Sequence, residues 1–476
     1  MSTADKTQEI KFGTDGWRGV MARDFTFENV RRVAQAIADY VKDETEKNPK
    51  RKPPFTGPVV VGYDRRFLSD AFAREIAQVL EGNQLNPVLL EETLPTPAIS
   101  FLTRKLKGMG IMVTASHNPP AYNGIKIKFD GRAVMPNVTG AVEAMLDKNM
   151  PSRSNEYKHK SYRDAYLDYL KSRFDTKKIA SKLKRPVVVD YMFGAASGLL
   201  EEVLPSKQLT AIHTKHDPLF GGLHPEPIMP YLSELSQTVK EKKALIGIAL
   251  DGDADRVGIV DDTGRYFTPC QVFPMVIEYL MEQKKLKGKI VQSVSLGYLS
   301  GRIAKAKGVE FEEMPVGFKH VAEALNAEQA VIAGEESGGY AWKGGLPERD
   351  GLVTALLFLE MCVTLNKTPS QIYKGIEEKY GKSVFKRVDY KLHKAVPDKA
   401  VFAAKIAKKL PKKILGTEIK NLIQIDGIKI ILADDHWLLM RPSGTEPLMR
   451  VYAESDSEKR TDELLQVATK WVSVSH

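Results

Sequence analysis

The sequence predicts an α/β protein of four domains, with three related units built on largely parallel sheets and a smaller α+β domain at the C-terminus. Strand-like apolar runs alternate with amphipathic helical patterns along most of the chain, as in parallel sheets covered by helices. The alternation restarts near residues 186 and 271 and changes character after residue 380. The length of 476 residues fits this division, because roughly 150 residues make one domain.

The first unit shows the order of elements that the later units repeat. A β-branched run over residues 59–63 predicts a strand, and a helical pattern follows over 70–81, with Gly82 in the position of a C-terminal cap. Two more strands are expected at residues 110–114 and 125–129. Strand, helix and strand in succession are the building block of an α/β sheet.

The remaining elements follow from the same patterns. In the second and third units we expect strands at 186–189, 245–250, 290–294 and 330–333 and helices at 198–204, 271–283 and 371–380. In the C-terminal part, Asp426-Gly427 between apolar runs predicts a hairpin over 422–432, and helices are expected at 401–410 and 461–474. A polar stretch near 148–160 marks the first boundary. We place the domains at residues 1–156, 157–261, 262–380 and 381–476.

Composition excludes several classes of protein. Two cysteines, Cys270 and Cys362, cannot make a disulfide-rich scaffold or a multi-cysteine metal site. The N-terminus lacks the apolar segment of a signal peptide, and the most apolar run, 351–363, is interrupted by Glu360 and is too short to span a membrane. We therefore expect a cytoplasmic protein with no membrane partner. The net charge of +10, from 70 Lys and Arg against 60 Asp and Glu, suits anionic small molecules as well as nucleic acid.

The sharpest motif is the aspartate triad, Asp251, Asp253 and Asp255, which lies between two apolar runs. In an extended segment alternate side chains share a face, so these carboxylates can converge on one hard cation. An EF-hand loop needs Gly at its sixth position and Glu at its twelfth, and here those positions hold Arg256 and Asp262. The alternative is a charged turn between strands, against which the close spacing of three aspartates argues.

A second motif, TASHNPP, begins at residue 114 directly after an expected strand. Its serine, Ser116, stands at the carboxyl end of that strand, where α/β proteins place ligands. The motif is not a G-x-S-x-G elbow, and the neighbouring His117 is expected to point away from Ser116, which disfavours a Ser–His hydrolase pair. A capping serine is the alternative. Lys126 is close enough in sequence to join this site, although a lone lysine is more typical of a solvated surface.

Three further segments offer groups that bind phosphate or sugar. A strand ending in Arg441 leads into a loop whose backbone N–H groups, hydroxyls and guanidinium can hold a phosphate, with an ordinary polar hairpin as the alternative. Two glycine-rich segments are weaker candidates. Arg18 lies in GTDGWRG, and Glu335 and Ser337 in GEESGG offer acceptors for sugar hydroxyls.

Together these motifs resemble the α-D-phosphohexomutase family, which includes phosphoglucomutases and phosphomannomutases. The resemblance extends over essentially the whole chain, with one characteristic loop in each expected domain and in the family's order. It implies three related α/β/α domains with mixed, largely parallel sheets and a smaller fourth domain, all around a central cleft. It also implies Mg²⁺ as cofactor and a hexose 1,6-bisphosphate as activator and intermediate.

The resemblance assigns the chemistry to residues of the first two domains. Ser116 would carry the transferable phosphoryl group, and the aspartate triad would bind magnesium together with an oxygen of that phosphoserine. Lys126 would transfer the hydroxyl proton, which calls for a pKa lowered by its surroundings, and His117 would lie beside it. Arg18 and Arg256 match arginines near the phosphoserine.

The resemblance also assigns the residues that bind the substrate. Glu335 and Ser337 would read sugar hydroxyls, and the loop beginning at Arg441 would hold the phosphate that is not transferred. Arg349 stands where phosphoglucomutases often have lysine. The residues expected to contact the sugar phosphate are Arg256, Lys319, Glu335, Ser337, Arg349, Arg441, Ser443, Gly444 and Thr445.

The reaction implied is reversible transfer of a phosphoryl group between the 1- and 6-positions of a hexose phosphate. The EES form of the sugar loop and the ERDG segment favour glucose 1-phosphate and glucose 6-phosphate. A phosphomannomutase or an enzyme of dual specificity is the alternative. A phosphoglucosamine mutase is less favoured, because its sugar loop usually differs between Glu and Ser, and a catalytically silent relative is disfavoured because the chemical residues are present.

A nucleic-acid-binding protein is the main rival of another class, since lysines are frequent over residues 391–420. That stretch lacks interleaved aromatic residues and is more typical of a solvated helix face. We therefore expect small-molecule hexose phosphates as partners, with neither nucleic acid nor a membrane, while the oligomeric state stays open.

Overall fold

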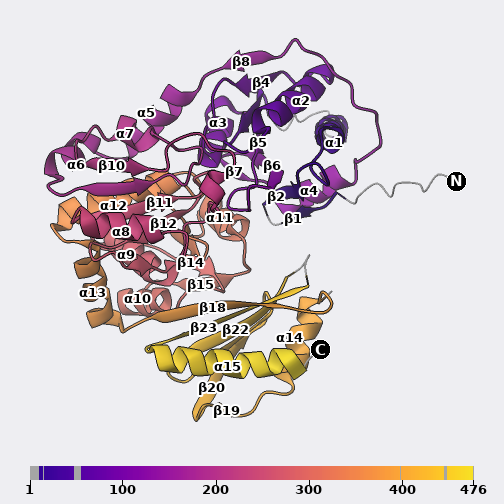
Figure 1. Cartoon of the computed structure of the whole chain (residues 1–476). Helices are drawn as coiled ribbons and strands as arrows, with labels where there is room; N and C mark the ends of the chain where they lie inside the picture. Colours follow the sequence, from indigo (N-terminus) through magenta and orange to yellow (C-terminus); the bar gives the residue numbers. More distant parts are fainter. Residues whose placement is uncertain (1–9, 14, 48–54, 397, 444–446, 475–476) are drawn as a thin grey trace. The chain divides into compact units, whose positions relative to one another are not determined.

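The computed structural model describes residues 10–13, 15–47, 55–396, 398–443 and 447–474 (Figure 1). The chain divides into two compact units. Unit 1 comprises Met1–Tyr266 and Gly344–Asn366, and unit 2 comprises Phe267–Lys343 and Lys367–His476. Helices alternate with strands up to residue 380, and an antiparallel sheet with two helices follows, so the expected fold class is confirmed.

The first sheet of unit 1 is mixed and has the strand order β1-β2-β6-β5-β3-β4-β8, with β7 paired to β6. Its strands are β1 (Phe12–Gly13), β2 (Gly16–Val20), β3 (Val59–Tyr63), β4 (Pro87–Leu90), β5 (Met109–Val113), β6 (Tyr122–Phe129), β7 (Arg132–Ala133) and β8 (Lys158–Lys160). The helices of this part are α1 (Phe27–Lys47), α2 (Ser69–Gly82), α3 (Thr96–Leu106) and α4 (Pro136–Glu143). The expected cap at Gly82 is wrong, because Gly82 is still helical and Asn83 caps α2.

The second sheet of unit 1 has the order β10-β9-β11-β12-β13. Its strands are β9 (Val187–Asp190), β10 (Leu209–Ile212), β11 (Ile246–Leu250), β12 (Val257–Val260) and β13 (Tyr266–Phe267). The helices are α5 (Arg163–Arg173), α6 (Thr176–Lys182), α7 (Leu199–Val203), η1 (Phe220–Gly222), α8 (Ser233–Glu241) and α12 (Gly351–Leu365). Helix α12 joins this unit from later in the chain, because it packs against α5, α6, β11 and β12.

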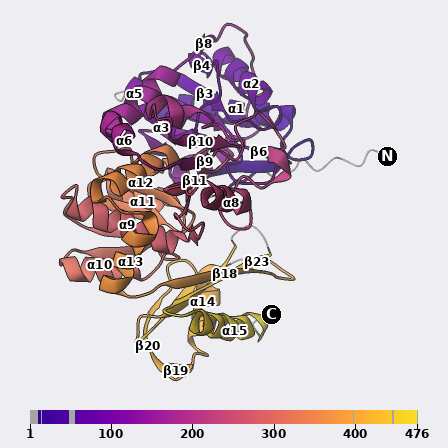
Figure 2. The same cartoon turned by 60° about the vertical axis from the view of Figure 1, so that its left-hand side comes forward.

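Unit 2 contains a third mixed sheet, β15-β14-β16-β17, and an antiparallel sheet, β18-β23-β22-β21-β20-β19. The third sheet consists of β14 (Ile290–Ser293), β15 (Phe311–Met314), β16 (Ile332–Glu335) and β17 (Gly339–Trp342), with α9 (Pro269–Glu282), α10 (Leu299–Lys307), α11 (Phe318–Asn326) and α13 (Pro369–Tyr380). The antiparallel sheet consists of β18 (Val384–Lys391), β19 (Lys413–Ile414), β20 (Thr417–Ile423), β21 (Ile428–Leu432), β22 (Trp437–Pro442) and β23 (Leu448–Ser455), with α14 (Lys399–Ala407) and α15 (Glu458–Val474). Figure 2 shows α14 and α15 on one side of the antiparallel sheet, with which they share a core.

The three mixed sheets repeat one topology. The orders β6-β5-β3-β4, β12-β11-β9-β10 and β17-β16-β14-β15 correspond strand for strand. In each, the last parallel strand turns back into an antiparallel one, β5 into β6, β11 into β12 and β16 into β17. Ser116, the aspartate triad and Ser337 lie in these three turns. The repetition predicted from sequence thus places the candidate loops at equivalent positions.

Length and apolar character decide whether one of the described helices could cross a membrane. No single one of them is long and apolar enough to cross a membrane, and α12 and α13 meet that criterion only together, as a bent pair.

Candidate active site

Ser116 lies in the turn after β5, with its side chain fully buried. Its backbone is in the left-handed region at φ 54°, and its N–H donates to Thr114 Oγ1 over 2.8 Å. The Ser116 hydroxyl donates to Asp251 Oδ2 over 2.9 Å. His117 Nδ1 lies 3.5 Å from the same hydroxyl oxygen, so the two side chains do not diverge as the sequence suggested.

Arg66 fixes this turn, and sequence analysis missed it. Its guanidinium is buried against Asp64 and donates to the backbone carbonyls of Ser116, Asn118, Pro119 and Tyr122 over 2.5–3.0 Å. Asp64 also accepts a hydrogen bond from Thr114. The pair Asp64 and Arg66 directly follows β3, and a charged pair at the carboxyl end of a parallel strand was a usable signal.

The aspartate triad converges, but by a turn rather than by the extended segment predicted. Ala254 adopts φ 53°, and one carboxylate oxygen of each aspartate lies within 4.8 Å of the others. All three side chains are buried. Asp253 Oδ1 and Asp255 Oδ1 have no hydrogen-bond partner among the described residues. Buried carboxylate oxygens that converge without donors are a fitting donor set for a hard cation such as Mg²⁺.

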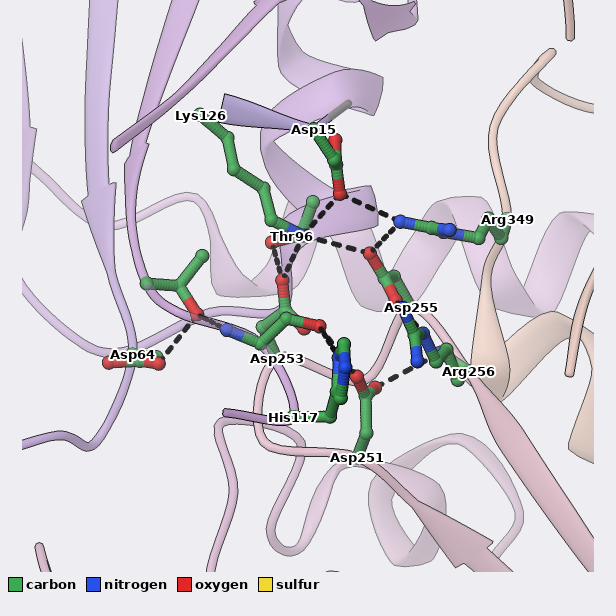
Figure 3. A network of polar contacts seen from close by, with 12 residues as sticks. Asp15, Asp64, Thr96, His117, Lys126, Asp251, Asp253, Asp255, Arg256 and Arg349 are labelled. Carbon is green, nitrogen blue, oxygen red and sulfur yellow. Dashed lines mark hydrogen bonds and ion pairs between the residues drawn. The ribbon is translucent and has the colours of Figure 1, made fainter. Parts of the chain in front are cut away.

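Two buried cations, Lys126 and Arg349, lie beside the triad and pair with its carboxylates (Figure 3). Lys126 Nζ lies 2.8 Å from Asp253 Oδ2 and 2.9 Å from both Asp255 Oδ2 and Asp15 Oδ2. Arg349 pairs with Asp255 at 2.8 Å and with Asp15 at 2.7 Å. Asp15, in the GTDGWRG turn, therefore bridges the two cations, although sequence analysis singled out only Arg18 there.

The charges explain the direction of each pKa shift. Burial lowers the pKa of Lys126, but the carboxylates of Asp15, Asp253 and Asp255 outweigh it and raise that pKa above its usual range. The lowered pKa expected of Lys126 is therefore wrong for this arrangement. Burial, then the cations around it, hold the pKa of His117 well below its ordinary value. Burial raises the pKa of Asp251, and its two fellow aspartates add to this.

The remaining candidates of unit 1 surround the same cluster. Arg18 donates to the side chain of Asn118 over 2.6 Å, and the backbone N–H of Arg256 donates to Asp251 over 3.0 Å. The neighbours of Arg349 are equally anchored: Glu348 accepts from Lys128 over 2.6 Å, and Asp350 accepts from Tyr166 over 2.8 Å. Unit 1 thus brings together Ser116, His117, Lys126, Arg18, Arg256, Arg349 and the aspartate triad.

Unit 2 holds the other candidates. Glu335 ends β16, where its carboxylate accepts from the Ser337 hydroxyl, and Lys319 lies in the first turn of α11. Arg441, near the end of β22, is mostly buried and donates to Asp426 over 2.6 Å. Ser443 is buried, and its N–H donates to the backbone carbonyl of Leu448. Gly444 and Thr445 lie outside the described residues.

Comparison with protein families decides the relationship. Models of the phosphoglucomutase/phosphomannomutase α/β/α domains I, II and III match residues 9–153, 164–264 and 268–380, and the model of the family's C-terminal domain matches 393–469. The chain belongs to the phosphoglucomutase/phosphomannomutase family. It is a phosphohexomutase-family enzyme, in the isomerase class, as the resemblance of its motifs implied.

Individual members of the family are similar over nearly the full length. A phosphoglucomutase/phosphomannomutase from Thermococcus kodakarensis is 30% identical, with 96% of this chain and 97% of the relative aligned. A phosphopentomutase from that organism is 30% identical, and a "probable phosphoglucosamine mutase" from Pyrococcus abyssi is 32% identical, each with 97% of both chains aligned. The structure of a "putative phosphomannomutase" from Thermus thermophilus superposes with a TM-score of 0.85 at 33% identity, covering 98% of this chain and 99% of that one.

Proposed function

We propose that this phosphohexomutase-family enzyme interconverts glucose 1-phosphate and glucose 6-phosphate through a phosphoserine at Ser116 and a glucose 1,6-bisphosphate intermediate. The observation that carries the proposal is the hydrogen bond from the Ser116 hydroxyl to Asp251, 2.9 Å away. It lies inside a buried cluster in which three carboxylates converge. A serine nucleophile beside a cation-binding triad supplies the two parts that phosphoryl transfer needs, a covalent carrier and charge stabilisation.

In the forward half-reaction, the bond between Ser116 Oγ and phosphorus breaks as a sugar hydroxyl oxygen bonds to the same phosphorus. The hydroxyl proton leaves to a nearby base, and the bisphosphate then turns so that its other phosphoryl group returns to Ser116. Lys126 is held as a cation by three carboxylates, so its part is to stabilise charge on the transferring group. His117 is held neutral and lies 3.5 Å from the hydroxyl oxygen of Ser116, so its imidazole can hydrogen-bond to the nucleophile, while its lowered pKa makes it a poor base for the sugar-hydroxyl proton.

Magnesium fits the aspartate triad, because two of its buried oxygens have no hydrogen-bond donor in the described part of the chain. Asp251, Asp253 and Asp255 would hold the ion, together with an oxygen of phosphorylated Ser116. When bound, a divalent ion offsets negative charge on phosphoryl oxygens. Arg66 meanwhile fixes the Ser116 turn through four carbonyls, which keeps the nucleophile in place for both half-reactions.

Glucose is the proposed sugar, with mannose or dual specificity as the second candidate. In the structure, the two residues on which the sequence argument for glucose rests make contacts with other residues of the protein. Glu336, the middle residue of EES, accepts from Ser295 over 2.7 Å and from Tyr452 over 3.4 Å. Arg349 is paired with Asp15 and Asp255. Both residues therefore make contacts within the protein. Because relatives are named as a phosphoglucosamine mutase and a phosphopentomutase, glucosamine and pentose phosphates should be among the substrates compared.

The test is a set of coupled assays with the 1-phosphates of glucose, mannose, glucosamine and ribose, each with magnesium and the matching bisphosphate. The variant Ser116→Ala should lose at least about a thousandfold in kcat, because the covalent carrier is gone. Ser172→Ala, an exposed serine on α5, is the matched control and should keep full turnover. The highest kcat/KM for glucose 1-phosphate supports the proposal. A higher value for another sugar replaces glucose, and full turnover by Ser116→Ala rejects the mechanism.

A further inference from the structure

We propose that Asp426 is a positioning residue, which orients Arg441 toward the substrate phosphate that is not transferred and couples it to the segment carrying Lys319. This inference rests on the proposed function and on the expectation, from the family resemblance, that Arg441 binds that phosphate. Asp426 was noted in the sequence only as part of a turn, and nothing in its local pattern marks it as part of a binding site.

One carboxylate joins three separate segments of unit 2. Asp426 Oδ2 accepts from Arg441 Nε over 2.6 Å and from the backbone N–H of Val316 over 3.2 Å, and Asp426 Oδ1 accepts from Lys399 Nζ over 2.5 Å. Val316 lies just before α11, three residues from Lys319. The carboxylate is therefore the common anchor of two of the three segments that are expected to contact the sugar phosphate in this unit, the third being the segment of Glu335 and Ser337.

The environment of Asp426 favours a fixed, ionised carboxylate. The side chain is largely buried, which raises its pKa, but Arg441 and Lys399 outweigh the burial and hold that pKa below its usual range. A guanidinium bound through Nε to a fixed carboxylate loses its rotational freedom, so its outer N–H groups point in one direction. Preorganisation of this kind lowers the entropic cost of binding a phosphate.

The turn that carries Asp426 rests directly on the strand that carries Arg441. Gly427 has φ 90°, and a Cβ atom there would lie 2.3 Å from the carbonyl oxygen of Met440 and 2.9 Å from the Cα atom of Arg441. Only glycine fits so close an approach at this backbone conformation. The hairpin between β20 and β21 is thereby held in register with the end of β22, so that the carboxylate reaches the guanidinium.

The test compares Asp426→Asn with Asp435→Asn, a partly exposed carboxylate of the same sheet that pairs with Lys420. Asp426→Asn should raise the KM for glucose 1-phosphate and the activation constant for glucose 1,6-bisphosphate about 10- to 100-fold, since charge-assisted hydrogen bonds that orient Arg441 are lost. Hydrolysis of phospho-Ser116 by water, which involves no second phosphate, should stay within about twofold of the wild-type rate. Asp435→Asn should leave all three quantities unchanged.

The second half of the test separates positioning from general damage. Gly427→Ala keeps every charged group but displaces the turn, and it should raise the same two constants while sparing phosphoserine hydrolysis. An unchanged KM in folded Asp426→Asn overturns the inference, as does a parallel loss of phosphoserine hydrolysis. If the wild-type enzyme turns over none of the sugar phosphates, the proposed function has failed, which is a distinct result.

Discussion

Two buried carboxylates, Asp255 in unit 1 and Glu454 in unit 2, show how differently one fold can accommodate the same chemical group. Asp255 faces the cations Lys126 and Arg349 at 2.9 and 2.8 Å. Among the described residues, Glu454 accepts hydrogen bonds from neutral donors: Ser383 Oγ at 2.5 Å, Trp437 Nε1 at 2.6 Å and the Tyr298 N–H at 2.8 Å. Burial raises the pKa of both groups, but the cations lower that of Asp255 below its usual range, whereas Glu454 stays raised.

The difference separates the proposed reactive site from a structural one. A buried ion pair is an expensive way to stabilise a fold, because desolvation of both charges offsets most of their attraction. Unit 1 nevertheless keeps several such charges together, with two carboxylate oxygens that have no hydrogen-bond donor in the described ranges of the chain, which suits a site whose partners change during a reaction. Glu454 instead joins the residues just before α10 and β18 to β22 through neutral donors of the framework, and so fixes this part of the C-terminal sheet.

The largest expected effect comes from replacing the reactive member of the pair. Asp255→Asn removes a charge that balances two cations and a proposed magnesium ligand, and kcat should fall by at least about a thousandfold. Stability should change little, because Lys126 keeps Asp15 and Asp253 as partners. Coupled kinetics and calorimetry of one preparation check both statements. Retained kcat with a collapsed Tm would reverse the assignment of Asp255 as functional.

Truncating the structural member should instead affect stability. Glu454→Ala leaves three buried donors unpaired, at about 1–3 kcal/mol each, so unit 2 should lose at least about 3 kcal/mol of unfolding free energy. Hydrogen exchange of peptides from β22 and β23, followed in urea, reports on this unit directly. Protection equal to wild type would show that water or rearrangement replaces the carboxylate.

A third buried carboxylate, Asp350, resembles Glu454 in having neutral donors, and the pH dependence of stability can test its raised pKa. Burial raises its pKa to about 6, and its nearest donors, Tyr166 and the N–H of Val353, are neutral. Because the pKa is higher in the folded chain, the contribution of Asp350 to stability is greatest below about pH 4 and falls as pH rises to about 6, by up to about 3 kcal/mol. Asp350→Asn does not titrate and still caps α12, so its unfolding free energy relative to wild type should rise over that interval. A difference independent of pH contradicts the raised pKa.

The sequence predicted the parts of the site that local pattern encodes. Strand runs such as residues 110–114 and 245–250 defined the sheets, and the loops after them held Ser116 and the aspartate triad. A carboxylate triad and a serine at the end of a strand can each be recognised from a few adjacent residues. Spacing therefore sufficed to propose a cation site and a serine at a ligand-binding position, whereas the expected role of Ser116 as phosphoryl carrier came from the family resemblance.

The missed residues act over long separations in sequence. Thr96 donates to Asp253, which lies 157 positions away in the sequence, and Arg349 pairs with Asp15, which lies 334 positions away. No local pattern records such pairings, and the charge state of Lys126 depends on carboxylates from two segments that only the fold brings together. The expectation of a lowered pKa for Lys126 was wrong for this reason. Asp426 was visible in the sequence as a turn residue, while its contact with Arg441 was not.

We expect the smallest effect from Glu454→Gln, which can be compared with the corresponding substitution Asp255→Asn. Glu454→Gln replaces a carboxylate whose charged form is less favourable than in water, because burial raises its pKa, and the amide oxygen can still accept from part of the donor set. The cost should be about 1 kcal/mol, the net value of one ordinary hydrogen bond, with kcat within about twofold of wild type. The chemically identical change at Asp255 should abolish turnover. Urea unfolding and steady-state kinetics of the two amide variants, measured side by side, decide the comparison: a large loss of activity in Glu454→Gln would place that carboxylate in the catalytic machinery rather than in the framework of unit 2.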